Sequence, residues 1–143
     1  MNSTTLSGNL ALIFLTVTIS LRPLVQVFPK IFFLKILLSK RRLIGNASAI
    51  LFIVHFLTLF PNVPFITDPR NPVFYGLLAA PLMMILFLTG NDLAVRILKR
   101  KWKYLHLLIH PLYILVLTHK GFPASLILFT AVYGLRLIAF LKK

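Results

Sequence analysis

The sequence predicts an all-α membrane protein that crosses the bilayer with five helices. Of its 143 residues, 59% are hydrophobic and only 13% are charged, whereas charged residues make up about a quarter of an average soluble domain. A soluble fold of this size exposes too much of its surface to hide such an apolar chain. The charged residues also lie mostly between long apolar segments, which is the pattern of a membrane protein.

The charge balance is strongly basic, with 16 Lys and Arg against 2 Asp and Glu and a formal net charge of +14. Basic nucleic-acid-binding proteins are normally polar and soluble, so we expect no nucleic-acid partner. In so apolar a chain, basic residues instead set the orientation in the membrane and contact lipid phosphates. The chain has no cysteine, which excludes disulfides, thiolate catalysis and iron–sulfur clusters.

Five segments have the length of a transmembrane helix, which needs about 20 mostly apolar residues. Prolines mark their limits, because Pro61 and Pro64 end the second segment and Pro72 opens the third. Gly121, followed by Pro123, separates the fourth from the fifth. The predicted helices cover residues 6–27, 43–60, 73–91, 102–118 and 123–141.

A sixth apolar stretch, residues 31–38, is too short to span a bilayer. Lys30 and Lys40 flank it. Short apolar segments with basic neighbours favour the boundary between lipid headgroups and acyl chains, so we expect an interfacial segment here.

The positions of the basic residues predict the orientation. Fourteen of the 16 lie in or beside the connection after the first segment, in or beside the connection between the third and fourth, or around the end of the fifth, whereas Arg70 and Lys120 lie in the other two connections. Because positive residues concentrate on the cytoplasmic side, the N-terminus is expected outside and the C-terminus in the cytoplasm.

All four histidines fall on the second and fourth predicted helices, as His55, His106, His110 and His119. His55 lies about 20 Å along its helix from Arg42, near the outer end, and His119 ends the fourth helix at the same side. Two neutral imidazoles at equal depth on neighbouring helices are what a b-type haem with two axial histidines needs. A plain helix–helix hydrogen bond, or an interfacial position for His119, is the alternative interpretation.

Packing roles are the stronger expectation for the other two histidines. His106 lies close to the basic cytoplasmic connection, and His110 directly precedes Pro111. Neither acidic residue falls at the centre of a span, which disfavours a proton relay or a divalent-cation site. A transporter or channel would need more polar residues within the spans than this chain has.

Several short motifs resemble the ferric-reductase-like transmembrane domain family. Residues 41–45 (RRLIG) with 53–57 (IVHFL) resemble one of its histidine helices, and 88–92 (LTGND) with 101–106 (KWKYLH) resemble the approach to the second. His119 then follows His106 by 13 residues, as in that family. The resemblance covers almost the whole chain and is strongest to the haem-binding membrane subunit of the periplasmic methionine sulfoxide reductase system.

The resemblance implies a cytochrome b-type bundle in which His55 and His119 are the axial ligands of an outer haem b. Family members with two haems carry a second histidine pair, but the position that would partner His106 is Arg41, which cannot bind iron. His106 is therefore left with either a second haem and a non-standard partner, or a hydrogen bond to a propionate or quinone. Arg41 and Arg42, with Arg100 and Lys103, are candidates to bind haem propionates, a flavin phosphate or a lipid phosphate.

The function implied is transfer of single electrons through an integral, multi-pass protein of the bacterial inner membrane or an equivalent energy-transducing membrane. The chain has no G-x-G-x-x-G motif for a nicotinamide or FAD domain, so electrons are expected from a quinol, a separate flavoprotein or a bound flavin. We therefore expect an electron-transfer component that passes electrons to a partner redox protein or a larger membrane complex, with no catalytic residue of its own. The alternative is a haem-free structural subunit of a membrane complex.

Overall fold

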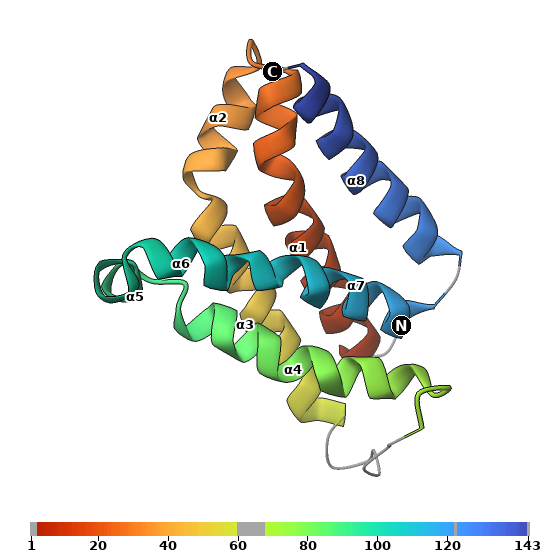
Figure 1. Cartoon of the computed structure of the whole chain (residues 1–143). Helices are drawn as coiled ribbons and strands as arrows, with labels where there is room; N and C mark the ends of the chain where they lie inside the picture. The colour runs from red at the N-terminus through yellow and green to blue at the C-terminus, as the bar shows by residue number, and fades with distance from the viewer. Residues whose placement is uncertain (1–2, 60–67, 122, 143) are drawn as a thin grey trace.

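A computed structural model of the chain describes residues 3–59, 68–121 and 123–142. Within these residues it is helical with no strand, which confirms the all-α prediction (Figure 1). The predicted end of the second segment at Phe60 lies outside the described residues. The helices are α1 (Ser3–Val27), α2 (Phe32–Ser39), α3 (Arg41–Leu59), α4 (Pro72–Leu88), α5 (Asp92–Leu98), α6 (Arg100–Leu105), α7 (Ile109–Lys120) and α8 (Ala124–Leu141).

Two of the described helices, α1 and α3, are long and apolar enough to cross a membrane. A third crossing results if α4 and α5 are counted as one span that is bent by 90° between them. Many large apolar side chains on these helices face outward, including Ile13, Ile50 and Leu57 at 56%, 52% and 62% exposure. So much exposed apolar surface indicates association with lipid.

The fourth predicted helix, residues 102–118, is divided in the structure. α6 ends at Leu105, a 3₁₀ turn covers His106–Leu108, and α7 begins at Ile109. Proline has no backbone N–H, so Pro111 cannot donate to the carbonyl of Leu107 as an α-helical residue would. The tighter 3₁₀ turn lies directly before this missing bond.

The third predicted helix ends earlier than expected, at Leu88, where the sequence had predicted residue 91. Asn91 begins a new helix instead, because its side-chain oxygen accepts a hydrogen bond from the backbone N–H of Ala94 at 2.8 Å. The short helix α5 then turns away from α4 and carries the charged residues of this connection off the axis of the span.

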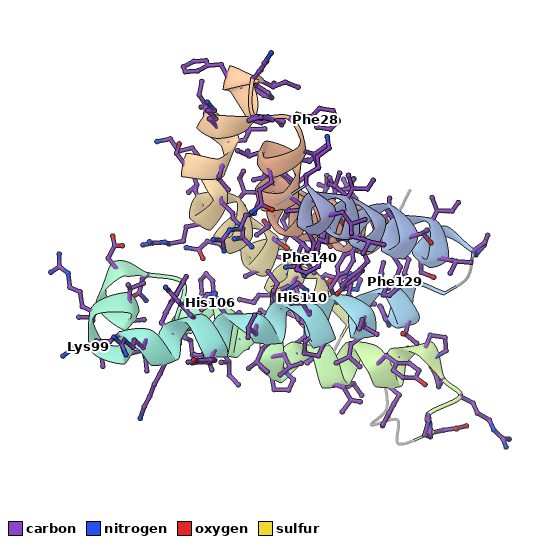
Figure 2. All side chains as sticks on the ribbon, turned by 45° about the horizontal axis from the view of Figure 1, so that its top comes forward. Phe28, Lys99, His106, His110, Phe129 and Phe140 are labelled. Atoms are coloured by element: carbon purple, nitrogen blue, oxygen red, sulfur yellow. The ribbon has the colours of Figure 1, made fainter. Side chains whose placement is uncertain are left out.

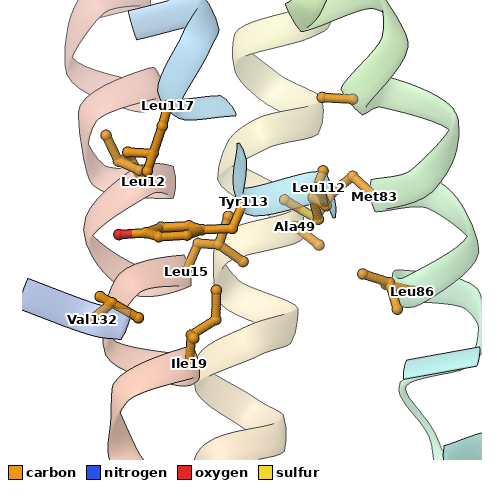
Figure 3. Packing of buried hydrophobic residues seen from close by; sticks show 11 residues of the cluster. Leu12, Leu15, Ile19, Ala49, Met83, Leu86, Leu112, Tyr113, Leu117 and Val132 are labelled. Carbon is orange, nitrogen blue, oxygen red and sulfur yellow. The ribbon is translucent and has the colours of Figure 1, made fainter. Parts of the chain in front are cut away.

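The helices form two closely packed pairs, α1 with α3 and α4 with α7 (Figure 1). Small residues bring the first pair together, since the buried Ser48 donates from Oγ to the carbonyl of Ala11 at 2.8 Å. Close approach through small residues is typical of membrane helices. Tyr113 of α7 is fully buried at the centre of the hydrophobic core, between side chains of α1, α3 and α4 (Figure 3).

Polar contacts bring several helix termini together at one end of the molecule, which we call the basic end. Arg41 at the start of α3 donates from Nε to the carbonyl of Thr18 on α1 at 2.7 Å. Arg136 in the last two turns of α8 contacts His110 near the start of α7, with Nη1 2.7 Å from Nε2. The C-terminus and α2 also lie at this end (Figure 1).

A second set of contacts defines the opposite end. Lys120 at the end of α7 hydrogen-bonds Asn9 near the start of α1. His119 contacts the first residue of α4, with Nδ1 2.9 Å from the carbonyl oxygen of Pro72. These contacts bring the start of α1, the start of α4 and the end of α7 together, while the α4–α7 pair runs across α1 and α3 (Figure 1).

Candidate functional site

His55 and His119 meet at the opposite end of the molecule. They come from α3 and α7, and their ring centroids are 6.3 Å apart with the ring planes inclined by 68°. An imidazole nitrogen bonds a transition metal at about 2 Å, and the ring centre lies roughly 1 Å further back, so two imidazoles on opposite sides of one metal have centroids about 6 Å apart. The observed separation matches that arrangement.

Local structure fixes the orientation of His119. Asn71 caps α4 by accepting from the N–H of Val73 at 3.0 Å, and Pro72 occupies the first helical position, where proline is favoured. The carbonyl of Pro72 then lies 2.9 Å from Nδ1 of His119. A carbonyl can only accept, so Nδ1 carries the proton and Nε2 keeps the lone pair that a metal needs.

Two glycines let the helices approach the two rings. A Cβ atom on Gly8 of α1 would lie 2.9 Å from Cε1 of His55, and one on Gly76 of α4 would lie 3.0 Å from Nδ1 of His119. Gly76 is one turn beyond Pro72, so its missing side chain leaves room for the bond from His119 to the Pro72 carbonyl. Glycine is the residue that permits such close backbone approach.

A cavity of about 540 Å³ adjoins the two rings, and we call it the histidine cavity. Its size is that of a site for a cofactor or small ligand, and its wall is mostly apolar with few polar groups, as such sites usually are. The apolar wall includes Leu12, Leu15, Phe52, Phe56, Met83 and Val116. The polar side chains that line it are Thr5, Asn9, His55, His119 and Lys120.

The donor set is suited to a haem better than to a bare metal ion. Among the described residues, no three histidine or carboxylate side chains gather closely enough to hold a metal ion alone. A porphyrin supplies four equatorial nitrogens itself, so two axial imidazoles complete its iron. The residues that could hold such a group are therefore His55 and His119.

His106 lies away from this pair and packs at the basic end. Its ring stacks on Trp102 with centroids 4.0 Å apart, and its Nε2 is 3.3 Å from the carbonyl oxygen of Thr89. Trp102 donates from Nε1 to the same carbonyl at 2.8 Å. Because Thr89 ends α4, both side chains satisfy a helix terminus.

The two predicted arginines have different surroundings. Arg41 is half-buried against α1 through its bond to Thr18. Arg42 is exposed and forms an ion pair with Asp92 at the start of α5. This ion pair joins α3 to α5, an arrangement that the spacing of the two residues did not predict.

Sequence reasoning missed the surroundings of His110. Its Nδ1 lies 3.2 Å from the hydroxyl of Tyr133, and Arg136 contacts its ring, all within the packing of α7 on α8. Figure 2 shows His106 and His110 near one another where the 3₁₀ turn leads into α7. The sequence feature that could have indicated these contacts is Arg136, a basic residue inside an apolar segment that needs a polar partner.

Comparison of the chain with protein-family models, with curated proteins and with solved structures gives no match. Inference about function therefore depends on the geometry of the paired imidazoles, on the cavity beside them and on the distribution of charge.

Proposed function

We propose that this protein is a membrane-embedded haem b electron-transfer protein of the ferric-reductase-like kind. His55 and His119 would be the axial ligands of one haem near the outer face. The observation that carries the proposal is the pair of imidazoles 6.3 Å apart beside an apolar cavity. The short motifs around residues 41–57 and 88–106 support it, because they resemble that family.

The chain's own groups would prepare the site. The Pro72 carbonyl orients His119 so that Nε2 faces away from the bond that holds the ring, which is the usual arrangement behind a metal-bound histidine. Lys120 and Asn9 line the same cavity and would pair with the carboxylates of the porphyrin. A haem with both axial positions filled supplies one-electron transfer and leaves no position for substrate.

We assign His106 to packing, and hence propose one haem. Its Nε2 faces the Thr89 carbonyl and its ring stacks on Trp102, so the ring is occupied in packing at the end of α4. Arg41, the residue in the position of a second ligand, cannot bind iron either.

We also propose that the bundle crosses the membrane five times. The five apolar segments of about 20 residues support this count, with the fourth crossing made by α6 and α7 together and the fifth by α8. The basic end carries α2 and the C-terminus (Figure 1), and positive residues favour the cytoplasmic side. The N-terminus would then be outside, in the bacterial inner membrane or an equivalent membrane.

The electron donor would be a quinol in the membrane or a flavoprotein at the cytoplasmic face. The acceptor would be a partner redox protein or a larger complex at the outer face, closest to the haem. With no substrate position at the iron, the protein would act as one component of an oxidoreductase system.

The test is the haem content of the purified protein. Expressed in cells supplied with a haem precursor and purified in detergent, it should carry one haem b per chain. The dithionite-reduced spectrum should contain the sharp α-band of a low-spin b-type haem. A folded, monodisperse protein that carries no haem under these conditions would contradict the proposal and favour a structural subunit.

The proposed orientation predicts which residues face which side. The chain has no cysteine, so single cysteines can be introduced without background. Arg70→Cys lies in an exposed connection at the opposite end and Arg96→Cys on exposed α5 at the basic end. In intact cells, a membrane-impermeant maleimide should label Arg70→Cys and should label Arg96→Cys only after permeabilisation. Labelling of both variants in intact cells would contradict the orientation.

A further inference from the structure

A second cavity of about 750 Å³ lies toward the basic end, and four arginines and Lys103 line it. Arg42 forms an ion pair with Asp92, whereas the other three arginines form none among the described residues. Arg22 comes from α1, Arg41 from the start of α3 and Arg136 from α8. We call it the arginine cavity. These arginines are far apart in the sequence, so the fold itself gathers three positive charges in one place.

Among the described residues, no carboxylate lines the cavity or pairs with Arg22, Arg41 or Arg136. The sequence contains two acidic residues, Asp68 and Asp92. Among the described residues the only ion pair joins Asp92 to Arg42, and Asp68 accepts a bond from the backbone of Arg70 outside the cavity. The cavity therefore has a strong excess of positive charge, which an anionic ligand would relieve.

The protein holds two of the arginine head groups in place, those of Arg41 and Arg136. Arg41 is fixed through Nε to the carbonyl of Thr18 at 2.7 Å. Arg136 is fixed through Nη1 to His110 at 2.7 Å, and Arg22 and Arg136 are close enough for their charges to act on Arg41. Positioned guanidinium groups of this kind bind phosphate through paired hydrogen bonds.

Part of the cavity wall is apolar, beside polar side chains such as Gln26 and Asn46. Ile19, Leu86 and Leu112 are buried members of the core that line it, and Phe140 lines it from α8 while 70% of its side chain is exposed. In Figure 2, Phe140 of α8 lies on the same side of the molecule as His110. A cavity with a cationic part and an apolar wall fits an amphiphilic anion, in which a phosphate is joined to hydrocarbon.

We propose that the arginine cavity binds the phosphate of an anionic phospholipid, with Arg22, Arg41 and Arg136 as its ligands. Basic pockets between membrane helices on the cytoplasmic side are typical sites for such headgroups. A soluble phosphate would use the arginines but leave the apolar wall without a partner. The inference stands apart from the haem proposal, because it involves other side chains at the other end of the molecule.

The experiment uses nanodiscs with equal amounts of phosphatidylglycerol and phosphatidylcholine, followed by native mass spectrometry. The wild-type protein should retain one phosphatidylglycerol in preference to phosphatidylcholine. In Arg41→Gln/Arg136→Gln this preference should fall about twenty-fivefold, since each arginine near an anionic lipid contributes roughly a fivefold factor. Arg22→Gln should reduce the preference for phosphatidylglycerol about fivefold. Because Arg22 is exposed, this variant should fold and tests the proposal even where the double variant does not.

The matched control is Arg96→Gln/Lys101→Gln, which removes two exposed charges near the basic end but outside the cavity. Its lipid preference should equal that of the wild type. Equal losses in the cavity and control variants, or no preference in the wild type, would overturn the proposal. A second arm titrates inorganic phosphate into lipid-free detergent samples. Stabilisation by phosphate without phosphatidylglycerol preference would assign the site to a soluble anion and likewise overturn it.

Discussion

His55→Ala and His119→Ala should each abolish haem binding while the protein still folds. Each change would remove one of the two imidazoles proposed to hold the haem, so the haem would lose most of its attachment to the protein. Removing a partner that only orients a metal ligand already costs roughly tenfold to hundredfold in affinity, so removing the ligand should lower the haem-to-protein ratio by more than about tenfold. The pyridine haemochrome assay and the reduced absorbance spectrum measure it.

His110→Ala is the matched control, because His110 lies on the same helix as His119 but contacts Tyr133 and Arg136. Its haem content should be unchanged. Free imidazole should restore the low-spin spectrum of His119→Ala, since the substitution leaves space where the ring had been, and a folding defect would not respond. Full haem content in both ligand variants would show that the histidine pair does something else.

Much of the fold was predictable because the bilayer imposes simple rules on sequence. Apolar segments near 20 residues and the prolines between them predicted most helix positions to within a few residues. The division of the fourth segment was harder to predict. Pro111 was visible, but whether a proline kinks a membrane helix or produces a 3₁₀ turn depends on the neighbours that support the backbone.

The pairing of His55 with His119 was also accessible, because depth in the membrane follows from residue number in a helix. The groups that hold the two rings in place could not be predicted from the sequence. Gly8 and Gly76 are ordinary glycines in apolar segments, and their role follows from which helix face packs on which histidine. The bond from His119 to Pro72 joins residues 47 apart, and no local pattern in the sequence indicates it.

The arginine cavity illustrates a second limit. Arg22 and Arg136 were counted for orientation alone, since a basic residue near the end of a span is commonly explained by the positive-inside rule. Their approach to Arg41 results from the packing of α1, α3 and α8. Only the structure reveals that these three charges, used for topology, line one cavity that no carboxylate of the described residues lines.

Gly8→Ala should disturb the haem site although it changes no ligand. The added Cβ would lie 2.9 Å from Cε1 and 3.0 Å from Nδ1 of His55, closer than van der Waals contact allows. Because the methyl group is fixed to a helix backbone, the His55 ring must move or the pairing of α1 with α3 must loosen. We expect haem affinity to fall about tenfold, the size of effect that loss of a ligand-orienting contact produces, and the reduced α-band to shift or broaden. Haem titration of the apoprotein measures both.

Gly134→Ala provides the matched control, since it makes the same substitution within a helix where a Cβ meets nothing within 4 Å. Alanine is favoured over glycine in helices by up to about 1 kcal/mol, so both variants gain the same propensity and differ only in what the methyl group touches. Gly134→Ala should keep wild-type haem affinity and be as stable or more so. If the two alanine variants bind haem equally well, the close contact between Gly8 and His55 does not position a ligand, and the argument that α1 helps to build the site fails.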